Sequence, residues 1–595
     1  MNYPVWYLPE IGGSTLIALI AIVHVFVSHF AVGGGLYLVL AERKGVREQN
    51  PDILAFTRAH SKFFLLVTMV VGGMTGVAIW FIISLVQPAG TSLLIHNFVF
   101  GWATEWVFFL VEIVALFIYF YTFDRMARRT HLVIGWIYFI AAWFSLFLIN
   151  GIIGFMLTPG QWLVDGDFWS GFFNPSFWPA LIFRTFVALL MAGLYAYVTC
   201  AWQKNQELKF TMTRFSGKWV LVALAGAVPS GFWYLSKLPQ PARTLVDGAS
   251  PTIARALDWG LYAVLAILLL SLVFTVIMPA LHNRVIAFVV LACGLLFMGA
   301  FEWTREAARR PYVVNEVMYS NGIFKDEVDD INRQGLLGSA RWVRIREFHE
   351  ESLLEIGQDL FKHQCHACHT IGGFNNDIVA RTANFSYPAL LTYLETIHQR
   401  RYFMPPFVGT ADEMRALATW IVTGLHGKPA EAAGPSVAGV GDGAGAQLFA
   451  DNCIFCHDTG LIKARTGGWS PDRVRSALDK LSALNPAMPD YAGTAAEKDL
   501  LAAFLVSLHA VGSTVPVAEG AGETVFETHC AMCHSLVEGY NPLLPKVSGW
   551  SRERVRAALD MLEKLQPAMP PMVASGEEKD ALAEFLYKKN QGGQP

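Results

Sequence analysis

The sequence predicts an all-α protein in two parts: a polytopic membrane bundle of about eight transmembrane helices, followed by three small all-helical domains. Two observations support this prediction. Residues 1 to about 305 are long apolar stretches, whereas the chain from about residue 345 onward has the composition of a soluble protein. That soluble part contains three copies of the pattern Cys-x-x-Cys-His, each in a similar local frame.

The overall composition excludes a single soluble domain. The chain has 595 residues, of which 54% are hydrophobic and only 16% charged, against about 25% charged residues in ordinary soluble proteins. A chain of this length also exceeds one domain. The formal net charge is −3, so the charge balance does not indicate a nucleic-acid partner.

Membrane helices explain the low charge of the first half. The hydrocarbon core of a bilayer requires roughly 20 apolar residues per helix, and eight stretches of the chain meet this requirement. The predicted spans are approximately 14–41, 63–87, 95–122, 132–158, 176–202, 217–235, 257–280 and 285–305.

The three Cys-x-x-Cys-His motifs are the attachment signature of c-type haem. They occupy residues 365–369, 453–457 and 530–534 and use six of the eight cysteines. In each motif two thiols bond the vinyl groups of the porphyrin, and the adjacent histidine becomes an axial iron ligand. The chain is therefore predicted to carry electrons. The predicted attachment residues are Cys365, Cys368, His369, Cys453, Cys456, His457, Cys530, Cys533 and His534.

A methionine in a proline-rich turn follows each motif; these are Met404, Met488 and Met569. A thioether opposite the histidine gives a low-spin iron with a raised potential, which suits electron transfer. The second and third units form an internal repeat, because Gly-Trp-Ser precedes Met488 and Met569 by the same interval. The alternative for each methionine is a packed core residue, and Met572 competes with Met569 for the ligand role.

The three units look like small all-helical cytochrome c domains, with one helix leading into each motif and another closing the unit. A stretch rich in Gly, Ala and Pro between the first two units indicates a flexible linker. We therefore divide the chain into a transmembrane domain (1–320), three cytochrome c domains (345–428, 446–512 and 522–590) and a linker (429–445).

The distribution of Lys and Arg predicts the orientation. These residues gather in the loops after the first, third and fifth spans, and the loops after the second and fourth contain neither. By the positive-inside rule the N-terminus lies outside, and eight crossings return the C-terminus to the same side. Covalent haem c attachment takes place on the outer face of bacterial inner membranes, which agrees. We expect a multi-pass protein of the bacterial inner membrane, with the N-terminus and the cytochrome c domains on the periplasmic side.

Ionisable side chains at membrane depth are costly, so each is a candidate for a functional site. His24 lies well inside the first span. Glu105 and Glu112 are seven residues apart in the third span and therefore share one helix face. The alternative for these three residues is a hydrogen bond between helices. His29 is about 140° around the helix from His24, so we expect that the two cannot face the same haem.

Four charged residues share one face where the eighth span ends: Glu302, Arg305, Glu306 and Arg309. Their carboxylates suit iron or protons, and their guanidiniums suit haem propionates. The alternative is an interfacial cluster whose side chains reach water. Three further histidines sit near cytoplasmic helix ends and are expected to be solvated, whereas one near the outer end of the third span remains an open ligand candidate. The solvated set is His60, His131 and His282, and the open candidate is His96.

The first 320 residues resemble subunit I of the cytochrome bd-type quinol oxidases. In that family, the residues matching His24, Glu105 and Glu306 serve a closely spaced pair of high-spin haems. The residue matching Glu112 belongs to a proton route, and the resemblance also implies a second membrane subunit. The matching segments are Ala21–His24, Gly33–Gly35, Glu105 and Glu112 ahead of Phe123–Met126, Asn150–Gly151, and Glu306–Tyr312 with Glu316.

The chain departs from this family at two places. The family's low-spin haem b uses a histidine in the fifth helix and a later methionine. This chain has Arg184 at the histidine position and no convincing methionine counterpart. Only residues 236–256 stand where the family has a long quinol-binding loop. The low-spin haem and the usual quinol site are therefore in doubt, and the c-type tail is an addition.

Three functions remain open at this point. Slightly favoured is an oxidase fed by cytochrome c that reduces oxygen or a similar small molecule. In it, His24 and Glu306 hold iron, Arg309 helps to bind the cofactor, and Glu105 and Glu112 form the catalytic proton-carrying pair. One alternative oxidises quinol and feeds periplasmic carriers; the other is an electron-wiring anchor of a larger respiratory complex. The expected cofactors and partners are three covalent haem c, one or two membrane haems of b or d type, soluble cytochrome c and, for the first alternative, quinone.

Overall fold

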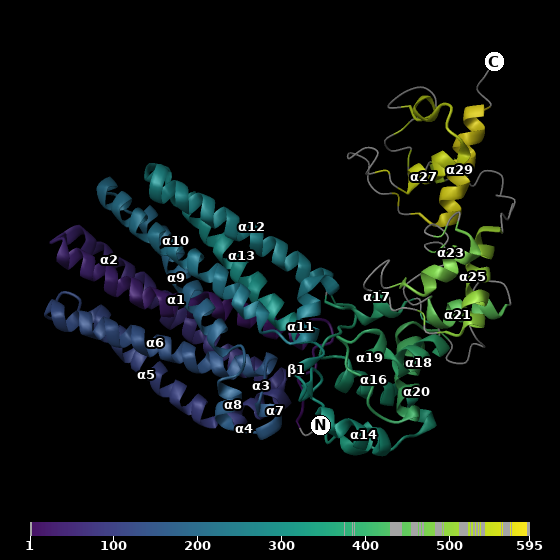
Figure 1. Ribbon diagram of the computed structural model, residues 1–595, viewed down its shortest axis with the longest axis horizontal. Coiled ribbons are helices and arrows are strands. Elements are labelled where there is room, and N and C mark those ends of the chain that lie inside the picture. Colours follow the sequence, from purple (N-terminus) through teal and green to yellow (C-terminus); the bar gives the residue numbers. More distant parts are fainter. Residues whose placement is uncertain are drawn as a thin grey trace. The chain divides into compact units, whose positions relative to one another are not determined.

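The computed structural model describes residues 3–373, 375–383, 387–428, 443–453, 469–481, 493–510, 542–560 and 574–591. It also describes the single positions 385, 462, 466, 491, 522, 523, 525, 526, 530, 534, 536, 562 and 572. The chain divides into two compact units, Met1–Pro435 and Ser436–Pro595, and Figure 1 shows that both are built almost entirely from helices. The first unit contains the long helices together with the first Cys-x-x-Cys-His motif.

Eight long helices form the membrane part of the first unit (Figure 1). Each is long and apolar enough to cross a bilayer, so the predicted polytopic, all-α architecture is confirmed. The second span is one continuous helix in which α2 (Pro51–Leu65) passes through a π-helical segment (Leu66–Gly72) into α3 (Gly73–Val86). The other seven are α1 (Gly13–Arg47), α5 (Val99–Tyr121), α6 (Arg128–Leu157), α9 (Phe177–Ala201), α10 (Gln206–Ser236), α12 (Pro251–Leu272) and α13 (Arg284–Ala308).

The second and sixth spans begin earlier than the apolar pattern predicts, at Pro51 and Gln206 instead of residues 63 and 217. In both cases an asparagine caps the helix inside a polar segment. The Asn50 side chain accepts hydrogen bonds from the backbone of the second and third helical residues at 2.9 and 3.2 Å, and Asn205 does the same at 3.0 and 3.3 Å. Because the caps lie outside the apolar window, hydropathy alone misses these helical turns.

Short elements connect the spans. The strands β1 (Tyr312–Val314) and β2 (Met318–Tyr319) pair antiparallel just after α13, with Tyr312 opposite Tyr319 and Val314 opposite Met318. The short helices of the membrane part are α4 (Pro88–Asn97), α7 (Trp162–Asp165), α8 (Phe168–Phe172), α11 (Gln240–Thr244), the π-helical segments Leu245–Ala249 and Val273–Ile277, and the 3₁₀ segment Pro279–Leu281.

Helix α1 lies at the centre of the bundle and packs against α2, α3, α6, α9 and α13. Its contact with α9 depends on Gly33. A Cβ atom at this position would lie 1.9 Å from the Ala188 carbonyl oxygen, which belongs to the backbone of α9. Only glycine therefore permits this close approach of the two helices.

Replacing Gly33 with alanine should destabilise the bundle by about 1–3 kcal/mol, because the two backbones must separate. The measurement is the thermal midpoint of the purified protein in detergent. Gly73→Ala is the matched control, since a Cβ at Gly73 meets no atom within 4 Å. Equal midpoints for the two variants would show that the close approach at Gly33 contributes nothing.

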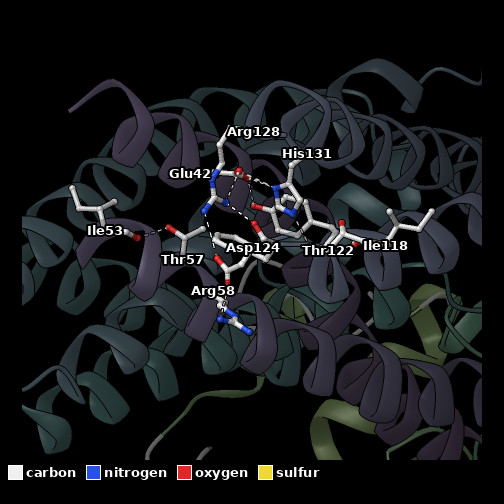
Figure 2. Close-up of polar contacts among 11 residues, drawn as sticks. Glu42, Ile53, Thr57, Arg58, Ile118, Thr122, Asp124, Arg128 and His131 are labelled. Atoms are coloured by element: carbon white, nitrogen blue, oxygen red, sulfur yellow. Dashed lines mark hydrogen bonds and ion pairs between the residues drawn. The ribbon is translucent and has the colours of Figure 1, made fainter. Parts of the chain in front are cut away.

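A buried polar cluster ties the predicted cytoplasmic ends of α1, α5 and α6 together (Figure 2). The Glu42 carboxylate interacts with His131 Nδ1 at 2.8 Å and accepts the Tyr119 hydroxyl at 2.8 Å. Arg128 approaches the same carboxylate at 3.6 Å. Neither Glu42 nor His131 is exposed. The expectation that His131 is solvated is therefore wrong, because neighbouring helix ends cover it.

The same correction applies to His60 and His282, which are also buried. His60 Nδ1 lies 2.9 Å from the hydroxyl of Thr199 on α9, and His282 Nδ1 lies 2.9 Å from the hydroxyl of Thr213 on α10. Each histidine thus joins the end of one helix to a threonine of another. Their position near helix ends did not reveal that these histidines are buried, because the helices that cover them are distant in the sequence.

The rest of the first unit is a small helical domain around the first motif. Helix α16 leads into the motif and α20 closes the domain, and the two pack together. At the start of α20, the Glu413 carboxylate accepts hydrogen bonds from the backbone N–H groups of Leu336, Leu337 and Thr410 at 2.7–2.9 Å. The helices are α14 (Val328–Gln334), α15 (Leu336–Ser339), α16 (Leu353–Gln364), α17 (Ile378–Thr382), α18 (Tyr387–Glu395), α19 (Ile397–Arg400) and α20 (Ala411–Thr419), with 3₁₀ segments Lys325–Glu327 and Glu350–Ser352 and a π-helical segment Trp420–Leu425.

The second unit holds the other two motifs. Helices α21 and α23 both pack against α25, and α27 packs against α29. The predicted linker at 429–445 lies outside the described residues except for 443–445. The described elements are α21 (Ala444–Asn452), α23 (Pro471–Leu478), α25 (Ala495–Ala510), the 3₁₀ segment Leu544–Val547, α27 (Arg552–Leu559) and α29 (Gly576–Gln591).

All three small domains share one helix contact that sequence reasoning missed. In each, a glycine eight residues before the first cysteine of the motif faces a backbone carbonyl of the closing helix. A Cβ at the glycine would lie 2.2–2.3 Å from that oxygen. The second and third domains also share an arginine over the repeated tryptophan, at 4.4 Å in both. The three glycine and carbonyl pairs are Gly357 with Ala416, Gly445 with Leu500, and Gly522 with Ala581.

Candidate functional site

One cavity of about 560 Å³ in the first unit brings the predicted membrane residues together. This volume is in the range of cofactor-binding pockets, roughly 300–1,000 Å³. Its lining comes mainly from α1, α3, α5, α6 and α13. The cavity also reaches the first Cys-x-x-Cys-His motif, because Ala367 and Cys368 belong to the lining. The predicted site residues that line it are His24, Glu105, Glu112, Glu306, Arg309 and Cys368.

His24 is held on the side of α1 that faces α3. Its Nδ1 lies 3.1 Å from the Thr75 hydroxyl oxygen, and that hydroxyl in turn donates to a backbone carbonyl at 2.8 Å. The hydroxyl therefore accepts from Nδ1–H, which leaves the lone pair on Nε2. An imidazole whose Nδ1–H is held in this way is the usual form of an iron ligand.

Glu105 and Glu112 lie on one face of α5, as predicted, and share a neighbour. The Ser145 hydroxyl donates to Glu105 at 2.8 Å, and Ser145 also interacts with the Glu112 carboxylate. Glu112 is 7% exposed, and its Oε1 has no hydrogen-bond partner among the residues that the structure describes. Two carboxyl groups joined through a hydroxyl can pass a proton along this face toward the cavity.

The charged residues at the end of α13 form an ion-pair network in which Glu302 and Arg309 are buried and Glu306 is partly exposed. Glu302 is 2% exposed and lies between Arg184 at 3.1 Å and Arg305 at 2.9 Å. Glu306 pairs with Arg305 at 2.6 Å and with Arg309. Each oxygen of Glu306 thus has one arginine partner and retains a further lone pair for another ligand. Glu302 is thus buried within the bundle, which the interfacial alternative did not foresee.

Arg184 occupies the position where the resemblance placed a haem-binding histidine. Its guanidinium pairs with Glu302 and stacks 5.5 Å above the Phe301 ring. An ion pair between α9 and α13 therefore stands at this place. Sequence reasoning named both residues but not their contact, because they are far apart in the chain.

The first c-type motif has the arrangement that haem attachment requires. His369 Nδ1 donates to the Asn376 carbonyl at 2.9 Å, so Nε2 carries the lone pair for iron. Burial lowers the pKa of His369 to about 4, which keeps the ring neutral near pH 7. The turn that bears Met404 is held by His398, whose Nδ1 donates to the Met404 carbonyl at 2.6 Å. The residues present therefore fit a covalently bound haem.

The other two motifs are described only in part. Cys453, Cys530 and His534 are described, and Met572, the competitor of Met569, packs against the apolar core of the third domain. The remaining predicted ligands lie outside the described residues. These are Cys456, His457, Met488, Cys533 and Met569.

The N-terminal segment docks the first cytochrome domain onto the membrane bundle, which sequence reasoning missed. The Leu8 N–H donates to His366 Nε2 at 3.1 Å, and the Tyr7 ring meets the His366 ring edge-on at 4.5 Å. The Ile371 N–H donates to the Pro9 carbonyl at 2.7 Å. Asn375 adds a bond to Thr15, at the start of α1, at 3.0 Å. The first motif is thereby fixed at the N-terminal end of α1.

His96, the open ligand candidate, is not part of the cavity lining. Its Nδ1 donates to the carbonyl of Ser92 one turn earlier on α4, at 2.8 Å. The side chain is exposed rather than buried. The structure gives it no role at the cavity.

Comparisons with known proteins agree with this architecture. A family model described as cytochrome bd terminal oxidase subunit I matches residues 15–234, so α12 and α13 lie beyond the match. A model described as cytochrome c oxidase, cbb3-type, subunit III matches three segments, 352–421, 442–505 and 518–586. A comparison with curated protein sequences gives no significant match.

Among solved structures, the chain is similar to one described as the structure of bd oxidase from Geobacillus thermodenitrificans. The identity is 17% and the TM-score 0.46, over 52% of this chain and 90% of that chain. The three cytochrome c matches imply haem c in the tail, and the cytochrome bd subunit I family binds haems of b or d type. By these family models the chain combines a segment that matches cytochrome bd terminal oxidase subunit I, residues 15–234, with three segments that match the cytochrome c subunit III of cbb3-type oxidases.

Proposed function

We propose that the chain passes electrons between its c haems and a haem site in the cavity of the membrane domain. The observation that carries this proposal is the shared cavity lining: His24, Glu105 and Glu306 on the membrane side, and Ala367 and Cys368 of the first motif. A subunit I domain joined to cytochrome c domains suggests respiratory electron transfer. Electrons then enter or leave the membrane haem site through the first cytochrome domain.

The residues divide into three roles. His24 and Glu306 hold iron, and Arg309 neutralises a propionate of the cofactor. Bound haem supplies one-electron chemistry and, where a coordination position is open, a place for a small molecule. The three Cys-x-x-Cys-His motifs would hold three haem c, and Met404, Met488 and Met569 would complete the binding of their irons. Glu112, Ser145 and Glu105 carry protons toward the cavity.

The reaction that these parts support best is reduction of oxygen, or of a similar small molecule, by electrons from a periplasmic cytochrome c. Dioxygen accepts four electrons and four protons to give two waters. Haem c held by the three motifs would supply the electrons one at a time, and the carboxyl pair on α5 would deliver the protons. The membrane orientation is N-terminus and tail outside, in a bacterial inner membrane, beside a second membrane subunit.

Spectroscopy of the purified full chain tests the proposal. Ascorbate-reduced protein should change its visible spectrum on adding carbon monoxide, which binds only iron with an open position. His24→Ala should abolish this change and remove a non-covalent haem, while three covalent haems per chain remain. His96→Ala is the matched control, since His96 does not line the cavity.

Other outcomes would redirect the proposal. Rapid reduction of the c haems by a quinol analogue would indicate that electrons run outward from quinol. Fully six-coordinate haems, with neither carbon monoxide binding nor quinol oxidation, would indicate an electron-wiring subunit. Wild-type protein that contains covalent haem alone would contradict a membrane haem site altogether.

A further inference from the structure

A second histidine of α1, His29, also lines the cavity, although the helical wheel places it on a different side from His24. Its surroundings follow from the tight contact between α1 and α9. Gly33 meets the Ala188 carbonyl, and one turn earlier on these two helices lie His29 and Arg184. His29 is 3% exposed and lies close enough to Arg184 and Glu302 to interact with them electrostatically.

The hydrogen bonding of His29 defines which ring nitrogen is available. Its Nδ1 lies 3.0 Å from the Val25 carbonyl oxygen, which can only accept, so Nδ1 carries the hydrogen. The lone pair is therefore on Nε2. That atom is buried and has no hydrogen-bond partner among the described residues. An imidazole oriented by a backbone carbonyl and carrying a free Nε2 lone pair is the usual form of a metal-binding histidine.

We propose that His29 is an axial ligand of a haem iron in this cavity, separate from the iron at His24. The two rings leave α1 on different sides: His24 toward Thr75 and Gly76 of α3, and His29 toward α9. One porphyrin cannot contact both histidine rings. The cavity therefore holds either two haems or one haem in two alternative positions. This assignment rests on the proposed membrane haem site and adds a ligand to it.

Two other histidines serve as internal comparisons. The Nε2 atoms of His60 and His282 are also buried without a partner among the described residues, but neither residue lines the cavity. If a substitution lowered the haem content only by disturbing buried packing, it would do so at both His60 and His29. If it removed an iron ligand, the haem content would fall at His29 only.

The experiment compares His29→Gly with His60→Gly in the full-length protein. Pyridine haemochrome spectra give the ratio of non-covalent haem to haem c, and the three covalent haems serve as the internal standard. We expect His29→Gly to lose one equivalent of non-covalent haem per three haem c, or to convert a low-spin electron paramagnetic resonance signal to high spin. Added imidazole should restore the wild-type signal, because it supplies the missing ligand. His60→Gly should retain the wild-type ratio.

The outcomes separate this inference from the proposed function. An unchanged ratio and spectrum in His29→Gly would overturn the ligand assignment and leave the site at His24 intact. A loss that imidazole does not reverse, or that His60→Gly reproduces, would overturn it in favour of a packing role. Wild-type protein without non-covalent haem would instead refute the membrane haem site itself.

Discussion

Replacing Cys365 and Cys368 with serine should reduce electron exchange between the soluble donor and the membrane haem to background. The two thiols are the predicted anchors of the haem in the first cytochrome domain, and under the proposed function that haem is lost without them. Cys368 lines the cavity, and its Sγ lies 3.7 Å from the hydroxyl oxygen of Ser320, directly after β2. The second and third motifs belong to a separate compact unit. Removing the first haem therefore interrupts the path at the domain that touches the membrane site.

Stopped-flow spectroscopy measures this effect. The oxidised protein is mixed with a reduced soluble cytochrome, and the c bands and the membrane haem band are followed separately. The double variant should still reduce its remaining c haems, while the membrane band stays oxidised. The matched control replaces Cys530 and Cys533, which also removes one covalent haem but leaves the first domain unchanged. If the membrane haem of the Cys365 and Cys368 variant were reduced at the wild-type rate, electrons would not reach it through the first domain.

The bundle itself was largely predictable because membrane helices need only length and low polarity. Eight apolar windows gave eight spans, and the largest boundary errors fell at Asn50 and Asn205, where polar caps begin the helices before the apolar run. The three haem motifs were equally readable, since their chemistry depends on adjacent residues. Contacts between distant segments were not readable. The glycine that contacts the closing helix recurs eight residues before each motif, as Gly357 does in the first domain, but its carbonyl partner lies in a segment distant in the sequence.

The candidate site shows the same division. Helical spacing correctly placed Glu105 with Glu112 and separated His24 from His29, because both follow from the geometry of one helix. It could not show that one cavity reaches both sides of α1, nor that Arg184 pairs with Glu302 on another helix. The burial of His60, His131 and His282 likewise depends on neighbouring helices. Pairwise packing between helices is the information that a single sequence lacks.

Glu302→Gln should be the most destabilising conservative change in the membrane domain, at about 3–5 kcal/mol, because it removes the charge from one side of a buried ion pair. The substitution keeps the shape of the side chain. Arg305 retains Glu306 as a partner. Arg184, only 5% exposed, loses the carboxylate that compensates its charge. Because this ion pair joins α9 to α13, the whole bundle of the variant should unfold at a lower temperature than that of the wild type.

The measurement is the thermal midpoint in detergent, followed through the membrane haem band, with the c bands as an internal reference for the tail. Asp330→Asn is the control, since its pair with Arg333 is exposed on both sides and should contribute at most about 1 kcal/mol. A midpoint for Glu302→Gln equal to that of the control would mean that Arg184 finds another partner. In that case the contact between α9 and α13 would be held by apolar packing, such as that of Phe183 on Phe301 at 4.8 Å, and not by charge.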